Sequence, residues 1–104
     1  MPKYYNKLIR DNIPEIIAAS GKTCITEVMD DEEYFSKLND KLNEEVAEYQ
    51  EDKSVEELAD ILEVIRAIVK AEGYSWEQLE EIRKAKEKKN GGFEKKLLLK
   101  EVSD

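Results

Sequence analysis

The sequence predicts a mainly α-helical fold, an antiparallel helical bundle that is completed by oligomerisation and carries a minor two-stranded β-ribbon. Apolar residues recur at helical spacing through two long segments, residues 31–51 and 55–72, which a short turn separates. The 104 residues suffice for one domain, residues 1–104, and leave no room for a second core. The apolar faces of the long helices exceed what so small a monomer can cover. We therefore expect a homodimer or a dimer of dimers.

A short helix and a strand are expected before the first long helix. Asp11 is placed to cap the short helix, Pro14 is tolerated in its first turn, and Gly21 ends it. Residues 22–29, KTCITEVM, are β-branched with partial alternation and predict a strand. Cys24 lies inside that strand. Because the chain has no His to activate a thiol, we expect Cys24 to be a small buried hydrophobe.

Capping signals mark both ends of the long helical hairpin. Asp30 offers an N-cap for the first long helix. A turn at residues 52–54 follows, and the pattern Ser54-x-x-Glu57 is a capping box that starts the second long helix. Gly73 is typical of a helix C-terminus and ends it.

The last helix turns basic and precedes a second predicted strand. The capping box Ser75-x-x-Gln78 begins this helix, and the run NGG at residues 90–92 ends it. Residues 93–102, FEKKLLLKEV, predict a strand. This strand is the expected partner of residues 22–29 in the ribbon.

Composition excludes several classes of function. The net charge is −8, with 25 acidic and 17 basic residues, so a general nucleic-acid binder is not expected. The absence of His removes the usual zinc ligand, and one Cys cannot form an intrachain disulfide or a cysteine zinc site. No signal peptide and no apolar run of membrane-spanning length is evident, which predicts a cytoplasmic protein without membrane contact.

Two carboxylate patterns flank the turn of the hairpin. The first is Glu45-x-x-Glu48 with Glu44 beside it, and the second is Glu57-x-x-Asp60. Residues three apart on a helix share a face, roughly 5–6 Å apart at Cβ, so antiparallel helices could aim these acids at one point. Such a cluster is costly unless a cation neutralises it, and Mg²⁺ prefers oxygen ligands.

A purely structural interpretation of these acids stays open. Charged residues make up 40% of the chain, so acid pairs at helical spacing also arise on solvated helix faces. Glu57 could simply satisfy the backbone at Ser54 as part of its capping box.

Two basic groups could complement the acids by holding phosphates. Lys7 and Arg10 lie near the N-terminus, and Lys86 and Lys89 lie in the basic end of the last helix. Helix C-termini favour cations through the macrodipole, which is the structural alternative for the second group.

The chain resembles the all-α nucleoside triphosphate pyrophosphohydrolases, the MazG-like group related to phosphoribosyl-ATP pyrophosphohydrolase and dimeric dUTPases. The sequence motif of the family is E-x-x-E on one helix and E-x-x-D on the next. Here the motif is matched by Glu45 and Glu48 in NEEVAEY and by Glu57 and Asp60 in VEELADILEVI. The opening NKLIRDNIPEII and the ending KKNGGFEKKLLLKEV are similar to a small-protein branch of this family. The resemblance covers nearly the whole chain.

The resemblance implies hydrolysis of a nucleoside triphosphate to the monophosphate and pyrophosphate. Nucleotide house-cleaning, a phage-encoded function and a biosynthetic step are all open as its biological role. One to three Mg²⁺ ions, or Mn²⁺, would be held by Glu45, Glu48, Glu57 and Asp60. Water activated by the metal would attack the α-phosphorus, with Glu48 or, alternatively, Glu44 orienting it.

The substrate contacts implied by the resemblance depart from the family pattern. Relatives usually carry Arg at the position of Asn90 and Lys or Arg at that of Asn12. Phosphate contacts would therefore fall to four other cations, Lys7, Arg10, Lys86 and Lys89. Phosphoribosyl-ATP and dUTP are alternative substrates, and a helical dimerisation or regulatory module without catalysis is the alternative function.

Overall fold

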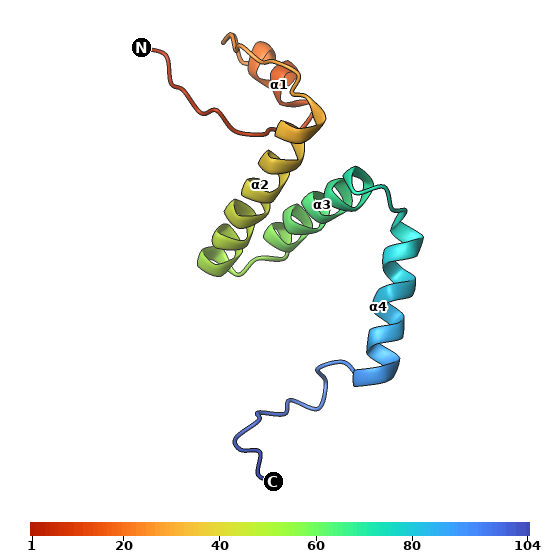
Figure 1. Ribbon diagram of the computed structural model, residues 1–104. Coiled ribbons are helices and arrows are strands. Elements are labelled where there is room, and N and C mark those ends of the chain that lie inside the picture. The colour runs from red at the N-terminus through yellow and green to blue at the C-terminus, as the bar shows by residue number, and fades with distance from the viewer.

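Four α-helices and no strand make up the chain in the computed structural model, which describes residues 1–104 (Figure 1). In chain order the helices are α1 (Ile13–Ala19), α2 (Asp31–Asp52), α3 (Val55–Ala71) and α4 (Trp76–Asn90). The helical part of the predicted fold class is confirmed. The three longer helices begin and end within a residue or so of their predicted bounds.

Helix α1 is short and begins without a side-chain cap. Asn12, not Asp11, stands at its N-cap position and makes no side-chain hydrogen bond there, so the predicted role of Asp11 is wrong. Pro14 is accommodated in the first turn, where a helix lacks a partner for its N–H. Gly21 follows the last turn with a φ of 85°, a conformation that favours glycine.

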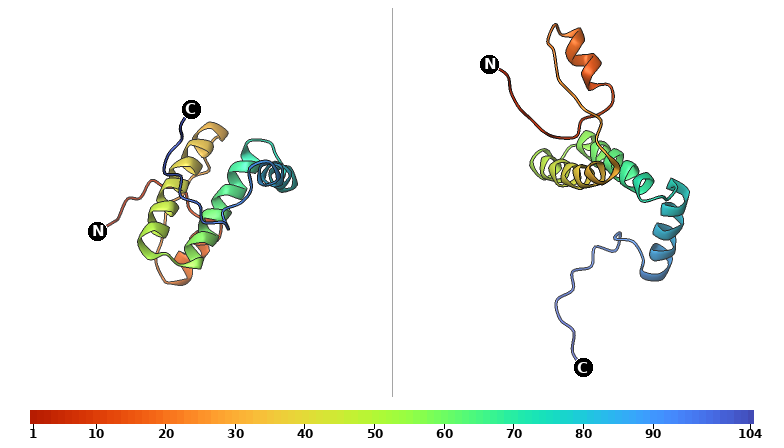
Figure 2. Two further views of the ribbon diagram at one scale, coloured as in Figure 1. Left: turned by 90° about the horizontal axis from the view of Figure 1, so that it is seen from below. Right: turned by 45° about the horizontal axis from the view of Figure 1, so that its top comes forward.

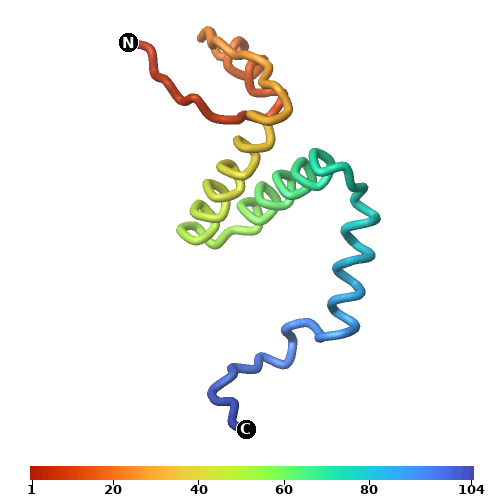
Figure 3. The backbone as a smooth tube through the Cα atoms, in the orientation of Figure 1, coloured from red at the N-terminus to blue at the C-terminus, as the bar shows by residue number.

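Helices α2 and α3 form an antiparallel hairpin (Figure 3). A side-chain cap fixes the start of each of the two helices. The Asp30 side chain accepts a hydrogen bond of 2.8 Å from the backbone N–H of Glu33 at the start of α2. Lys53 ends α2 in the left-handed region, with a φ of 58°, and its N–H donates to the Tyr49 carbonyl at 2.7 Å. The chain then reverses within two residues and starts α3.

The core of the single chain is small. Leu38 of α2 and Val64 of α3 are buried, with 2% and 8% of their surface exposed. The third buried residue is Glu45. Helix α4 contacts only α3 and turns away from the hairpin, while α1 stands clear of it (Figure 2). One chain therefore supplies a helical pair and not a closed bundle.

The overall dimensions show how open the chain is. Its accessible surface is 9821 Å², whereas a compact monomer of 12.1 kDa exposes about 6000 Å². Its radius of gyration is 18.6 Å, whereas a compact domain of this length has about 13 Å. The excess surface includes large apolar side chains, among them Val55, Leu58 and Leu62 on one face of α3.

The structure does not confirm the β-ribbon, because residues 22–29 and 93–102 form no strand in it. The two segments lie at opposite ends of the molecule, before α2 and after α4 (Figure 1). β-Branched residues stabilise a strand only where a neighbouring strand takes up the backbone hydrogen bonds. Cys24 is exposed in the first segment, so its predicted burial is also wrong.

Candidate metal centre

The turn of the α2–α3 hairpin brings three of the predicted acids together. Glu45 lies near the end of α2, and Glu57 and Asp60 lie in the first turns of α3. One carboxylate oxygen from each of the three lies within 4.8 Å of the other two. Because the helices are antiparallel and joined by a tight turn, the end of one helix faces the beginning of the next.

Two oxygens of this cluster are buried without a hydrogen-bond partner. They are Oε2 of Glu45 and Oε2 of Glu57. Glu45 is 7% exposed as a residue, and its other oxygen pairs with a lysine. A buried, unpartnered carboxylate oxygen loses its hydration without compensation, which costs free energy. This feature distinguishes the cluster from the solvated acids that cover most of the molecule.

The Glu57 side chain does not form the predicted capping box with Ser54. The Ser54 hydroxyl accepts a hydrogen bond of 3.3 Å from the backbone N–H of Glu57, but the Glu57 carboxylate makes no return bond to Ser54. At α4 the equivalent box is complete, since Gln78 Oε1 accepts from the N–H of Ser75 at 2.8 Å. The Glu57 carboxylate is thus left free for the cluster.

Burial and mutual repulsion both act on the cluster's protonation. Burial raises the pKa of Glu45, Lys41 lowers it, and the charges of Glu48 and Asp60 raise it again, with a net increase. The pKa of Glu57 is raised by desolvation and then by the charges of Glu48 and Asp60. Both groups hold their protons more tightly than an ordinary glutamate, which is the expected state of crowded carboxylates without a cation.

Two cations from the N-terminal segment, Lys7 and Arg10, reach acids of both helices of the hairpin. Arg10 Nη2 donates to Asp60 Oδ1 at 2.7 Å, and Lys7 Nζ donates to Glu44 Oε1 at 3.1 Å. Burial alone would raise the pKa of Glu44, but the bond from Lys7 and the charges of Lys41 and Lys7 hold it below its ordinary value.

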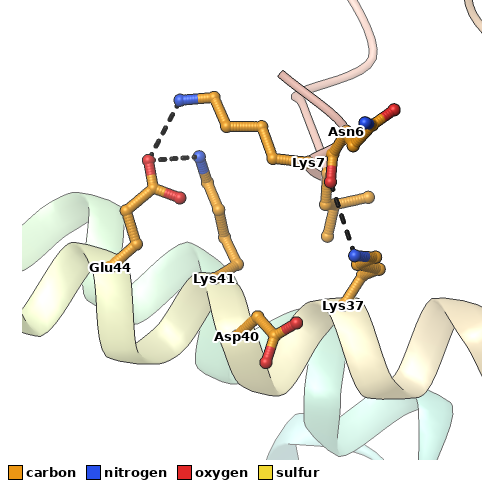
Figure 4. A pocket seen from close by; sticks show the side chains of 7 residues that line it. Asn6, Lys7, Lys37, Asp40, Lys41 and Glu44 are labelled. Atoms are coloured by element: carbon orange, nitrogen blue, oxygen red, sulfur yellow. Dashed lines mark hydrogen bonds and ion pairs between the residues drawn. The ribbon is translucent and has the colours of Figure 1, made fainter. Parts of the chain in front are cut away.

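Lys41 is a residue of the site that the sequence prediction missed. Its Nζ lies 3.3 Å from Glu45 Oε1. It also lies 3.5 Å from Glu44 Oε1 (Figure 4). Its side chain is only 16% exposed. The signal was present in the spacing, because Lys41 precedes Glu44 and Glu45 by three and four residues on one helix.

Other predicted site residues are not brought into the cluster. Glu48 is exposed and lies outside the three-acid group, although its charge is close enough to raise the pKa of Glu45 and of Glu57. Lys86 and Lys89 are exposed on α4 and pair with none of the cluster acids. Within one chain, α4 contacts α3 alone and turns away from the hairpin (Figure 2).

An open groove of about 1000 Å³ runs past the cluster. Glu45, Asp60 and Arg10 lie along it, and its aromatic wall includes Tyr74 and Trp76. The Arg66 guanidinium covers the ring of Trp76 at 5.3 Å from the centroid. A ligand bound in this groove would contact acidic, basic and aromatic side chains.

The residues present fit a hard divalent cation. Three carboxylates converge, two of their oxygens lack partners, and no His or Cys takes part. All-oxygen ligand sets suit Mg²⁺, Mn²⁺ or Ca²⁺ more than zinc or copper. The ligand atoms of the cluster are therefore of the type that such an ion prefers.

Comparisons with known proteins add little to these observations. No family model matches the chain, and no solved structure matches it. A protein of Mycolicibacterium smegmatis, described as uncharacterized, is 52% identical over 42 residues. The match covers 40% of this chain and 43% of that protein, so the chain spans less than half of its relative. None of the helices is both long and apolar enough to span a membrane.

Proposed function

We propose that this protein is a Mg²⁺-dependent nucleoside triphosphate pyrophosphohydrolase of the MazG-like, all-α type. The observation that carries the proposal is the pair of buried, unpartnered oxygens of Glu45 and Glu57. These two residues and Asp60 each bring one carboxylate oxygen within 4.8 Å of the other two. The E-x-x-E and E-x-x-D patterns that define the resemblance supply these residues. The product pair would be a nucleoside monophosphate and pyrophosphate.

The carboxylates divide into ligands and a base in this proposal. Glu45, Glu57 and Asp60 would hold Mg²⁺ or Mn²⁺, which supplies charge neutralisation at the phosphates and acidifies water. Glu48 is exposed beside them and is free to accept a proton from the attacking water. Glu44 is the poorer base, because its carboxylate is engaged by two lysines and its pKa is lowered.

Cations of the N-terminal segment would steady the phosphates. An anionic substrate approaches a chain of net charge −8, so positive groups near the acids are needed. Arg10 pairs with Asp60 at the edge of the groove and would exchange this carboxylate for a phosphate. Lys86 and Lys89 can join the site only from a second copy of the chain or after α4 has moved.

Homo-oligomerisation is part of the proposal. The chain exposes about 3800 Å² more than a compact monomer of its mass would, several times the roughly 800 Å² per partner of a standard interface. Val55, Leu58 and Leu62 lie three and four residues apart and form an exposed apolar stripe along α3. A homodimer or a dimer of dimers would bury this stripe and complete the helical bundle. The extended segments before α2 and after α4 could find strand partners in such an assembly.

The substrate class and compartment follow from the proposed reaction. Nucleoside triphosphates and Mg²⁺ meet in the cytoplasm, where nucleotide house-cleaning would take place. Phosphoribosyl-ATP and dUTP are the alternative substrates, and a panel of nucleotides scored for released pyrophosphate separates them.

The test is the Asp60→Asn variant, compared with Glu56→Gln as a control. Asp60→Asn removes one charge of the cluster, whereas Glu56 is an exposed neighbour on the same helix. Loss of nucleotide turnover is expected for Asp60→Asn alone, in a protein with unchanged circular dichroism and sedimentation. A folded and fully active Asp60→Asn protein would exclude the proposed site. If the folded parent protein turned over no nucleotide, the non-catalytic helical module would be favoured.

A further inference from the structure

We propose that Lys41 is a positioning residue that orients the Glu45 carboxylate for a divalent cation. This inference depends on the proposed metal site and adds to it a residue that neither the acid patterns nor the comparisons assign. It concerns how the chain prepares a ligand before any ion arrives.

The two oxygens of Glu45 have different surroundings. Oε1 forms an ion pair with Lys41 Nζ at 3.3 Å, while Oε2 is buried and has no partner. An ammonium on one oxygen limits rotation of the carboxylate, so the second oxygen keeps a fixed direction. Lys41 thus leaves Glu45 with one satisfied oxygen and one oxygen available to a cation.

Lys41 is itself held in place. Its side chain is 16% exposed, and its Nζ also lies 3.5 Å from Oε1 of Glu44. Lys7 donates to that same oxygen at 3.1 Å (Figure 4). Alternating charges therefore link the N-terminal segment through Glu44 and Lys41 to Glu45. A long side chain with two carboxylate partners and little exposure has lost most of its rotamer freedom.

Helix stabilisation alone is a weaker explanation of the Lys41–Glu45 pair. In isolated helices, the order Glu then Lys at a spacing of four is better than Lys then Glu, and either is worth only about 0.2–0.5 kcal/mol. The order here is the less favourable one. Groups that hydrogen-bond to metal ligands from outside the coordination sphere have much larger effects, with about 10–100-fold losses of metal affinity when they are removed.

An ammonium near a bound cation also repels it, so the two roles predict opposite signs. If Lys41 mainly orients Glu45, its removal weakens metal binding. If it mainly contributes positive charge, its removal strengthens binding. The sign of the change therefore distinguishes the two roles.

The experiment compares Mn²⁺ binding, measured by electron paramagnetic resonance without nucleotide, in the full-length parent and three variants. Lys41→Met keeps the length of the stem and removes the ammonium, and Lys41→Arg keeps a cation. Lys37→Met is the control: Lys37 lies one turn earlier on α2, and its ammonium donates a hydrogen bond to the Asn6 carbonyl at 3.4 Å and forms no ion pair with an acid of the cluster. Circular dichroism and sedimentation verify the fold and assembly of each variant. Should Lys41→Met fail to fold, Lys41→Gln takes its place.

We expect Mn²⁺ affinity to fall about tenfold or more in Lys41→Met, to be largely restored in Lys41→Arg, and to stay unchanged in Lys37→Met. Unchanged or tighter binding by folded Lys41→Met would overturn the positioning role and leave the metal site standing. A parent protein that binds no Mn²⁺ would remove the metal site itself and, with it, this inference.

Discussion

The carboxylates of Glu45 and Glu57 are placed at a cost to the metal-free protein. Each has one oxygen that is buried without a partner, and each has a raised pKa because of burial and neighbouring acids. Crowded acids of this kind are characteristic of sites that bind a cation or protons, and they reduce stability until the ligand arrives. This cost can be measured.

Glu57→Gln should raise the thermal stability of the metal-free protein at neutral pH. The substitution removes one of the mutually repelling charges and, like Gln78 at α4, can complete the capping box of its helix. We expect Mg²⁺ to raise the Tm of the parent protein, and Glu57→Gln should abolish that rise. Glu56→Gln changes the same charge on an exposed neighbour and should preserve that rise. Calorimetry with Mg²⁺ and with EDTA provides both readouts, and an unchanged Mg²⁺ response in Glu57→Gln would argue against a ligand role.

The stability of the metal-free parent should fall as the pH rises through the titration of Glu45 and Glu57. A carboxyl whose folded pKa is raised binds more protons in the folded than in the unfolded state above the ordinary value of 4.5. Its stabilising contribution is fully present below that value and is lost as the pH passes the raised pKa. Glu44, with its lowered pKa, acts in the opposite sense at lower pH.

Melting curves in EDTA between pH 4 and pH 8 measure this dependence. The decline should be smaller in Glu57→Gln than in the parent, because one of the two groups no longer titrates. Identical pH profiles for the two proteins would show that Glu57 is an ordinary solvated carboxylate.

At the scale of single residues, the acids were predictable from the sequence and their partners only in part. The spacing within the two patterns placed Glu45, Glu57 and Asp60 near one another. Glu48 fell outside the cluster because it lies further round α2 from the hairpin contact. Arg10 was expected near phosphates, but its pairing with Asp60 depends on how the N-terminal segment crosses α3, which helical periodicity does not encode.

At the scale of elements, the start of α3 is the part of the fold that sets the site. Ser54 caps the helix by accepting a hydrogen bond from the N–H of Glu57. Glu57 is the third residue of that helix. Movement of the first turn would therefore move a cluster carboxylate. The N-terminus of α4 has the same kind of cap, at Ser75, and carries no cluster residue.

Ser54→Ala and Ser75→Ala form a matched pair that separates capping from site geometry. Each should cost about 1 kcal/mol, or about 4–8 °C in Tm, through loss of an N-cap. Only Ser54→Ala should also weaken Mn²⁺ binding, because loss of the cap loosens the first turn of α3, which carries Glu57. Equal Mn²⁺ affinities in the two variants would show that the first turn of α3 does not position the cluster.

The elements themselves were predictable where local signals decide them. Caps at Asp30, Ser54 and Ser75 and glycines after α1 and α3 placed the helix ends correctly. The two predicted strands do not form in the structure, because a strand requires a partner. Residues 22–29 and 93–102 lie too far apart in one chain to pair. Pairing is a property of tertiary or quaternary structure, which local composition cannot supply.

At the scale of the whole molecule, the single chain is an open assembly of helices. It extends over 63 Å in its longest dimension and buries only three residues. This openness accounts for the distance between the acids of the hairpin and the basic end of α4. It also explains why a closed bundle could be predicted only together with oligomerisation.

Leu62→Glu should prevent the proposed homo-oligomerisation. Leu62 is 48% exposed on the apolar stripe of α3, and a charge buried in an apolar interface is strongly unfavourable. Sedimentation velocity should show the parent as a dimer or tetramer and the variant shifted toward monomer. Asn43→Glu, on an exposed polar position of α2, adds the same charge and should leave the assembly intact. A monomeric parent protein would contradict the proposed assembly.

The measurement that tests the central claim most directly is the identification of products from nucleoside triphosphates and Mg²⁺. The purified protein is incubated with each common ribo- and deoxynucleoside triphosphate, with Asp60→Asn as the matched inactive variant, and the products are separated by chromatography. We expect monophosphate and pyrophosphate from at least one nucleotide with the parent protein and none with Asp60→Asn. Diphosphate and phosphate would mean attack at the γ-phosphorus and would contradict the proposed reaction, as would no product from a folded protein that binds Mn²⁺.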